Sequence, residues 1–324
     1  WNGLQRLEVV SVTLDQDRDE PQLVFESMNS TGLDLETSDL VRNYMLMGCS
    51  MAEQKTLYED YWLPMERVLG NLSFDVFLHD WMVVTLKKPV LKGHVMYAEF
   101  KRFAADSSLL RMERTRNLLA NMLEYAKYYA AIKGVAAAGS CDMNVDRRLE
   151  SIQKLGSTVT DPLVMYMFAA WKRDRVSCDG LLRMLADLES YLFRRMICSV
   201  SSNGLNKLVP SLIVRLDSAE DDLAEPFAAL LITETAKATR MPTDSEFRQA
   251  LLGENLYRPA WRCKYLLAGL ENHNHPKVPR SFSEYTIEHI MPQNAMAHAE
   301  WCNMLADLDR FPLLVNSLGN LTLT

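Results

Sequence analysis

The sequence lacks the features that would place it in a membrane or in an oxidising compartment. No apolar run among its 324 residues reaches the length of a membrane span. The most apolar stretch, EPFAALLITETA at residues 225–236, is short and broken by polar residues. The opening WNGLQRLEVV has neither the basic nor the apolar region of a signal peptide. The six cysteines are scattered without a C-x-x-C pair, which predicts reduced cytoplasmic thiols rather than disulfides or structural zinc.

Basic residues are also in deficit. Lys and Arg number 35 against 42 Asp and Glu, a net charge of −7, which argues against a generally basic nucleic-acid coat but leaves room for a local basic patch. Three nucleotide and hydrolase motifs are missing, namely G-x-x-x-x-G-K-[ST], G-x-G-x-x-G and G-x-S-x-G. A P-loop site, a Rossmann site and an α/β-hydrolase are therefore not supported.

The patterns that are present are mostly helical. Apolar residues recur at three-four spacing through residues 50–270, and S/T-x-x-E capping boxes occur at 50–53 and 243–246. An earlier β-branched run at 7–14 predicts a strand, and residues 37–47 predict a helix capped by Thr37 or Ser38. We therefore expect a mainly α fold with a short α/β piece at the N-terminus.

The pattern changes after a polar, proline-containing stretch at 272–281, which is predicted to be a linker. EYTIEHI at 284–290 predicts a strand, AMAHAEWCNMLAD at 295–307 a short helix, and NLTLT at 320–324 another strand. A small α/β unit is therefore expected to begin near residue 281.

Glu288 and His289 stand side by side in the first of these strands. Neighbouring strand residues point to opposite faces, so both can reach one site only where the strand ends or distorts, and Pro292 is consistent with such an end. Metal-assisted phosphodiester hydrolysis uses such a pair, because a carboxylate holds a divalent cation and an imidazole takes a proton from water. The alternative is a strand-end histidine held by a backbone carbonyl.

The surrounding residues YTIEHIMPQN…W…LGNLTL resemble the HNH, or His-Me finger, nuclease domain of the GmrSD-like restriction endonucleases. The resemblance covers residues 285–324, with a helical lead-in, LYRPAWRCKYLLAGLE. It implies that His289 is the general base, that Glu288 binds Mg²⁺ or Mn²⁺, and that Asn320 orders the site. Trp301 is expected to be a packing residue.

The family continues after G-N-L-T-L into a helix that supplies a further metal ligand, whereas this sequence ends at Thr324 and begins at Trp1 rather than Met. The resemblance therefore implies an incomplete ββα-metal (HNH) finger at the C-terminus. We expect the chain to be an internal fragment of a longer protein and to be inactive alone.

A second resemblance lies at residues 24–46, VFESMNSTGLDLETSDLVRNYML. It is similar to the pattern F-E-x-x-N-S-T-G-x-x-L-x-x-x-D-L-x-x-N of the GmrS-type, ParB/sulfiredoxin-like domain, which is linked to NTP hydrolysis and to sensing modified DNA. The residues of interest form a small polar turn and its neighbour: Asn29, Ser30, Thr31, Gly32 and Asp39. Such a turn can present backbone N–H groups to a phosphate, or it can simply cap a helix.

Two other groups of residues suggest chemistry. Arg258, Arg262 and Lys264 in YRPAWRCK could contact DNA phosphates, or they could be ordinary surface charge. His273 and His275 resemble a metal pair, but no acid or cysteine stands at ligand spacing, so a solvated loop is the preferred interpretation.

Taken together, the patterns predict three parts: residues 1–130 as the end of a GmrS-type sensor domain, 131–280 as a helical connecting region, and 281–324 as a truncated finger. The expected function is that of a fragment of a type IV, modification-dependent DNA endonuclease in phage defence. The expected partner is DNA, including modified phage DNA; no membrane is involved and a homo-oligomer is left open. The alternatives are a non-catalytic helical interaction module with a degenerate finger, or a regulatory NTPase fragment.

Overall fold

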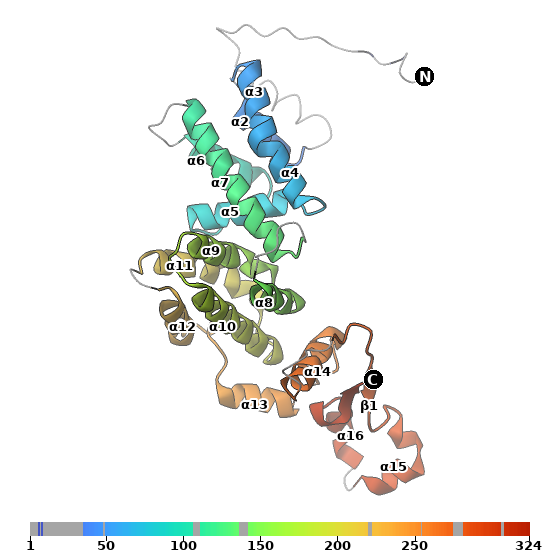
Figure 1. The fold of residues 1–324 in the computed structure, drawn as a ribbon. Helices are drawn as coiled ribbons and strands as arrows, with labels where there is room; N and C mark the ends of the chain where they lie inside the picture. The colour runs from blue at the N-terminus through green and yellow to red at the C-terminus, as the bar shows by residue number, and fades with distance from the viewer. Residues whose placement is uncertain are drawn as a thin grey trace. The chain divides into compact units, whose positions relative to one another are not determined.

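A computed structural model of the chain describes residues 6, 8, 35–47, 49–105, 111–135, 142–219, 222–253, 255–274, 281–305 and 308–324. The described residues are mainly helical, as predicted (Figure 1). They fall into two compact units, one within residues 1–82 and 90–127 and the other within 83–89 and 128–324. The predicted strand at 7–14 and the turn at Asn29–Gly32 lie outside the described residues.

The first unit is built on helices around an aromatic core. Its helices are α2 (Thr37–Leu46), α3 (Met51–Leu57), α4 (Leu63–Leu69), α5 (Phe74–Leu86), α6 (His94–Ala105) and α7 (Arg111–Ile132), of which α5 and α7 end in the second unit. A π-helical turn at Tyr58–Trp62 joins α3 to α4, immediately before Pro64. The wider turn accommodates Pro64, because a proline ring clashes with the carbonyl of a regular preceding turn. The core side chains include Trp62, Phe77, Trp81 and Phe100, each at most 1% exposed.

The N-terminus of α2 is capped from another helix. The side chains of Thr37 and Ser38 were predicted to cap it, but both residues are buried and neither side chain makes the cap. Their backbone N–H groups instead donate to the Asp75 carboxylate of α5, at 3.0 and 2.7 Å. A carboxylate satisfies these donors and also complements the positive end of the helix dipole, so the prediction was right about the helix and wrong about the cap.

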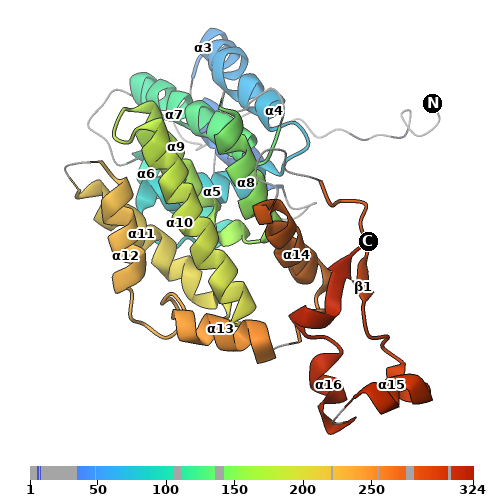
Figure 2. The same cartoon turned by 60° about the horizontal axis from the view of Figure 1, so that its bottom comes forward.

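The second unit is organised around one helix that is buried over most of its length. Its helices up to residue 274 are α8 (Met143–Lys154), α9 (Asp161–Lys172), α10 (Cys178–Ile197), α11 (Leu205–Asp217), α12 (Ala224–Thr233), α13 (Asp244–Gly253) and α14 (Ala260–Asn274). Residues 161–170 of α9 are all buried. A helix that is apolar on every side must lie inside a bundle, and α9 packs against α10 and α11 (Figure 2). Helix α10 also packs against α8 and α12.

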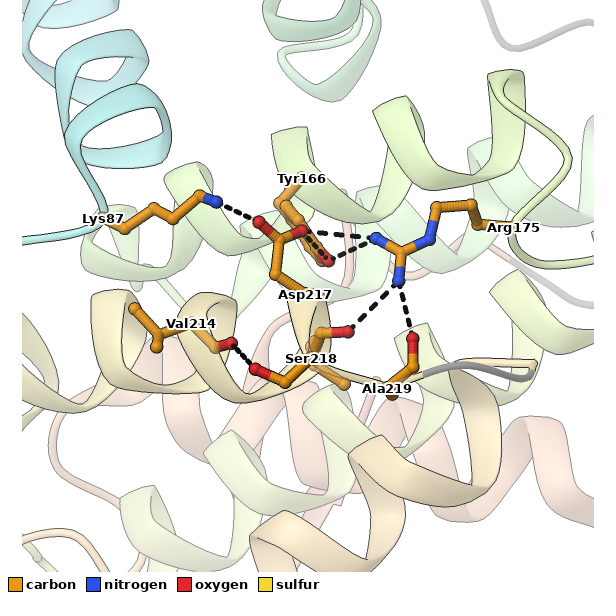
Figure 3. Close-up of polar contacts among 8 residues, drawn as sticks. Lys87, Tyr166, Arg175, Val214, Asp217, Ser218 and Ala219 are labelled. Carbon is orange, nitrogen blue, oxygen red and sulfur yellow. Dashed lines mark hydrogen bonds and ion pairs between the residues drawn. The ribbon is translucent and has the colours of Figure 1, made fainter.

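A charged network ties the end of α11 to α9 and to the segment after α5 (Figure 3). The Asp217 carboxylate accepts hydrogen bonds from the Tyr166 hydroxyl at 2.8 Å, from Arg175 at 3.2 Å and from Lys87. Arg175 also donates to the carbonyls of Leu216 and Ala219. Burial alone would raise the pKa of Asp217, but the hydrogen bonds from Lys87 and Tyr166 outweigh it and lower that pKa. Burial raises the pKa of the Tyr166 hydroxyl.

Both predicted capping boxes are present. At α3 the Ser50 hydroxyl accepts from the Glu53 N–H at 3.3 Å, and the Glu53 carboxylate accepts from the Ser50 N–H at 2.7 Å. At α13 the same pair of bonds joins Thr243 and Glu246, at 3.3 and 2.8 Å. Glu246 also binds the Arg240 guanidinium through both oxygens.

The C-terminal residues form the small α/β arrangement that the sequence predicted. Strands β1 (Ile287–His289) and β2 (Leu321–Leu323) pair antiparallel, and α15 (Ala299–Met304) and α16 (Phe311–Leu314) lie between them in the chain. The prediction of a linker was wrong for residues 272–274, because α14 continues through His273 to Asn274. No helix among the described residues is both long and apolar enough to cross a bilayer.

Candidate functional site

The strand pair positions His289. In the register of β1 and β2, Ile287 faces Leu323, Glu288 faces Thr322 and His289 faces Leu321. Ile287, Leu321 and Leu323 pack against Cys263 and Leu267 of α14. Because side chains alternate along a strand, His289 lies on this covered face and the exposed Glu288 lies on the opposite one.

Three side chains surround the His289 ring, which is half-buried. The ring meets Tyr257 edge to face, with centroids 4.7 Å apart. Its Nε2 atom lies 3.1 Å from Oδ1 of Asn316 and 3.3 Å from Nε2 of Gln293. No hydrogen bond to its Nδ1 atom is made by the described residues. The described residues therefore hold the ring on its Nε2 side.

Asn320 fixes the backbone that follows His289. It is 8% exposed, and its Oδ1 accepts from the Met291 N–H at 2.6 Å. Its Nδ2 donates to the carbonyls of Met291 and Val315, at 3.0 and 2.8 Å, while its own carbonyl accepts from the Ile290 N–H at 2.9 Å. The buried Asn320 side chain thus joins the backbone that follows β1 to the backbone that precedes β2. Its role in the described contacts is structural, because its polar atoms are occupied by backbone groups.

A small apolar cluster supports this clamp. Met291, Ala295 and Val315 are buried together. Partly buried side chains surround them, namely Trp301, Leu305, Phe311 and Leu314. Trp301 is a packing residue, as predicted. The segment between the strands therefore has a core of its own, which holds the His289–Asn320 geometry in place.

The described residues do not gather a cluster of metal ligands. No group of three or more His, Cys, Asp or Glu side chains placed to hold a metal ion occurs among them. Glu288 is the carboxylate nearest to His289 in sequence, and it is exposed on the other face of the strand. The exposed Glu288 carboxylate is a hard oxygen ligand of the kind that Mg²⁺ and Mn²⁺ prefer.

Of the three cationic residues proposed to contact DNA, Arg262 is buried, whereas Arg258 and Lys264 are at least partly exposed. Arg262 is 7% exposed and donates to the carbonyls of Met196, Asn255 and Arg258. This guanidinium holds α14 to the end of α10, so the prediction that Arg262 contacts DNA is corrected. Arg258 is exposed, and Lys264 is half-buried and donates to the Ser283 carbonyl at 2.6 Å.

Of the candidate residues in the N-terminal motif, the structure describes one. Asp39, from the N-terminal motif, lies in α2 and pairs with Arg42 at 2.7 Å. The rest of the proposed nucleotide turn, Asn29, Ser30, Thr31 and Gly32, lies outside the described residues. Near the strands, burial raises the pKa of the Cys263 thiol to about 11, so this thiol stays protonated at neutral pH and is no candidate nucleophile.

Residues 241–324 match the model of the GmrSD restriction endonucleases, C-terminal domain. The suspected resemblance is confirmed over these residues. The match to the GmrSD domain begins at residue 241, well before residue 281, and it includes α13 and α14, of which α14 packs side chains on the strands. No curated protein matches the chain.

The GmrSD-type segment also contains two residues that sequence reasoning missed. Tyr257 and Asn316 both contact His289. Asn316 stands four positions before Asn320 in VNSLGN. A second asparagine so close to a predicted site residue was a weak indication that Asn316 also belongs to the site. Tyr257 stands in the lead-in LYRPAWRCKYLLAGLE, but its contact with the ring could not be predicted, because only the packing of this segment on the strands brings the two together.

Proposed function

We propose that this chain is part of a modification-dependent DNA restriction endonuclease of anti-phage defence, with His289 as the general base. The observation that carries the proposal is the half-buried His289 ring, held on its Nε2 side and followed by the Asn320 clamp, inside the segment that matches the GmrSD domain. A general base must be oriented, and the Nε2 contacts of His289 with Asn316 and Gln293 support that role.

The proposed reaction is hydrolysis of a DNA phosphodiester. A ring nitrogen of His289 accepts a proton from water, and the resulting hydroxide forms a bond to phosphorus. The P–O bond to the leaving oxygen breaks, and that oxygen takes a proton from solvent. Holding the base beside the attacking water lowers the entropic part of the barrier. Asn320 acts in this scheme by ordering the backbone after His289 and does not touch the reacting atoms.

A divalent cation, Mg²⁺ or Mn²⁺, is part of the proposal. Glu288 fits it as a ligand because its carboxylate is exposed and hard, and because Mg²⁺ commonly retains several waters and shares the substrate phosphate. The bound cation would supply stabilisation of the negative charge that develops on the phosphate. We also propose that an NTP acts through Asn29, Ser30, Thr31 and Gly32.

The test is cleavage of DNA by the native protein purified from its source cells. Plasmid DNA and DNA from phages with modified bases are incubated with Mg²⁺, with Mn²⁺ or with a chelator. We expect cleavage that requires the cation, and His289→Ala should lower its rate by at least about 100-fold, since a general base contributes that much. Glu288→Gln should raise the cation concentration needed for half-maximal cleavage.

The matched control is His298→Ala, which removes an exposed histidine of the same segment and should leave the rate unchanged. Equal rates for the native protein and His289→Ala would overturn the assignment of the base. Failure of every DNA substrate, with cation present, would favour the alternative below.

The alternative is a non-catalytic interaction module in which the strand pair is a structural remnant. One observation favours it, namely that Glu288 and His289 lie on opposite faces of β1. It predicts that His289→Ala changes partner binding or nothing at all. Capture of a partner by the inactive wild-type chain, lost in variants of the helical region, would support it.

A further inference from the structure

A pocket lies between α8, α10 and α14, apart from the site around His289. Its volume is about 890 Å³, which lies within the range of small-molecule sites. One face of α14 lines it with residues spaced three and four apart: Trp261, Lys264, Tyr265, Ala268 and Asn272. The residues that contact His289, namely Tyr257, Gln293 and Asn316, are not part of this lining.

Polar and aromatic contacts join the three helices at the pocket. The Glu189 carboxylate of α10 accepts from the Tyr265 hydroxyl at 2.6 Å and from the Arg148 guanidinium of α8 at 2.5 Å. The rings of Phe193 and Tyr265 lie with their centroids 5.5 Å apart. Because each Glu189 oxygen has a donor and Arg148 offsets its charge, this carboxylate does not exclude an anion from the pocket.

Trp261 offers an aromatic surface to the pocket. Its side chain is 46% exposed, and it makes no ring contact with another aromatic residue in the described part of the chain. Small residues share the lining, and a Cβ atom added to Gly269 would meet no atom within 4 Å. The pocket therefore has room for a flat ring system against Trp261, and every nucleobase has such a face.

Positive charge lines the same pocket. Lys264 donates to the Ser283 carbonyl at 2.6 Å and forms no ion pair with a described carboxylate. Arg148 is 42% exposed, and among the described residues it bonds to Glu189 alone, so its other N–H groups can donate to an anion. Trp261 and Lys264 are three residues apart on one helix face, which sets their Cβ atoms about 5–6 Å apart. One nucleotide can span that distance with its base and its phosphate.

We propose that this pocket binds a nucleotide, with the base stacked on Trp261 and the phosphate facing Lys264 and Arg148. The nucleotide is either free or a unit of a single strand, since both present the same base and phosphate. The proposal goes beyond the function proposed for His289, because the pocket shares no residue with that site. It gives Lys264 a phosphate contact, in line with the sequence-based prediction for this residue.

The experiment measures binding to the native protein by calorimetry in the presence of a chelator, so that cation-dependent cleavage does not interfere. The probes are deoxynucleoside 5′-monophosphates, the corresponding nucleosides, inorganic phosphate and a short single-stranded oligonucleotide. We expect the monophosphates or the oligonucleotide to bind more tightly than nucleoside or phosphate alone, because base and phosphate both contribute. Monophosphates that bind as tightly as the oligonucleotide identify a free nucleotide, and tighter binding of the oligonucleotide identifies a unit of a strand.

Two pairs of variants place the binding in this pocket. Trp261→Ala should weaken binding at least about fivefold, since the stacking of one base is lost, whereas Trp261→Phe should keep most of the affinity. Lys264→Gln should weaken binding of the nucleotide but not of the nucleoside, and should lower the salt dependence of oligonucleotide binding by about one released ion. Lys264→Arg should restore both.

The matched controls are Leu252→Ala and Lys207→Gln, which change an exposed apolar and an exposed cationic residue outside the pocket and should leave affinity unchanged. Unfolding temperatures show whether each variant is folded, and the two positions test the pocket independently. Wild-type affinity in folded Trp261→Ala would overturn the proposal, as would failure of all nucleotide probes to bind. Because binding requires no cleavage, a native protein that binds nucleotides but cleaves no DNA would count against the proposed nuclease function alone.

Discussion

The networks around Asp217 and Asn320 each join segments that are distant in sequence, but they do so with different chemistry. Asp217 is a carboxylate whose side chain is 30% exposed, and it gathers two cations and a hydroxyl (Figure 3). Asn320 is a neutral amide, 8% exposed, and its side chain binds backbone groups of Met291 and Val315. The first network should respond to pH and salt, whereas the second should respond to neither.

The difference matters for the site. A neutral amide orders the backbone beside His289 without placing a fixed charge there. Under the proposed function the neighbouring substrate group is an anionic phosphate, which a carboxylate at the position of Asn320 would repel. The charged network lies instead at the end of α11, where its task is to hold α9, α11 and the segment after α5 together.

The largest effect is expected from breaking the amide clamp. Asn320→Ala removes three hydrogen bonds and leaves the Met291 N–H without its partner in a buried position. We expect a loss of about 3 kcal/mol in the stability of the unit that contains it. Thermal unfolding and hydrogen exchange at Met291 measure this. Asn303→Ala, at an exposed position of α15, is the control and should change stability by less than about 0.5 kcal/mol.

The charged network should give the next largest effect, and one that depends on pH. Asp217→Asn keeps the shape but removes the charge that faces Lys87 and Arg175, and should cost about 2 kcal/mol at neutral pH. The folded pKa of Asp217 is lowered, so its contribution is complete above the unfolded value of about 3.9 and is lost as pH falls through the folded pKa.

The measurement compares unfolding temperatures of the wild type and Asp217→Asn from neutral pH downward. The difference should shrink under acid conditions, whereas the difference caused by Asn320→Ala should stay constant over the range in which the wild type remains folded. A pH-independent Asp217→Asn difference would remove the distinction drawn between the two networks.

Much of this architecture was predictable because its signals are local. Apolar spacing predicted the helices of the middle region, and S/T-x-x-E predicted the bonds of Ser50 with Glu53 and of Thr243 with Glu246. The β-branched and apolar runs placed β1 and β2 within a few residues of their observed bounds. Each of these features depends on residues within one turn or one strand of one another.

The features that were missed depend on tertiary contacts. Asn316 lies 27 positions after His289, and the two meet only because β2 pairs with β1. The sequence predicted that Arg262 contacts DNA or is ordinary surface charge, but Arg262 is buried and donates to three backbone carbonyls. The cap of α2 comes from Asp75, more than 30 residues away. In each case the residue type is compatible with several roles, and the packing of another element chooses among them.

The corrected role of Arg262 gives a third, intermediate prediction. Arg262→Lys keeps the charge but loses the planar fork that serves carbonyls of Met196, Asn255 and Arg258. We expect a loss of about 1.5 kcal/mol in thermal unfolding. Arg258→Lys, at an exposed position of the same segment, is the matched control and should leave stability unchanged. Equal changes in stability for Arg262→Lys and Arg258→Lys would show that the buried hydrogen bonds of Arg262 do not stabilise the fold.

The smallest effect is expected at the capping box of α13, which is charged like the Asp217 network but whose carboxylate is somewhat more exposed, at 42% for Glu246 against 30% for Asp217. Glu246→Gln removes the charge that binds Arg240 and the Thr243 N–H, so a small drop in unfolding temperature is expected at neutral pH. The Arg240 hydrogen bond, followed by those from Thr243, lowers the pKa of Glu246 from its ordinary 4.5 to about 2. The contribution is therefore complete above pH 4.5 and is lost only as pH falls through about 2.

Added salt compares these two partly buried networks. Salt should diminish the Glu246→Gln difference somewhat more than the Asp217→Asn difference, since the Glu246 carboxylate is the more exposed of the two and exposed charges are screened more strongly. Glu271→Gln, at an exposed position of α14, is the control and should show no difference at any salt concentration. A salt response of Glu246→Gln weaker than that of Asp217→Asn would mean that exposure does not govern these two networks, and that the geometry of the Arg240 pair does.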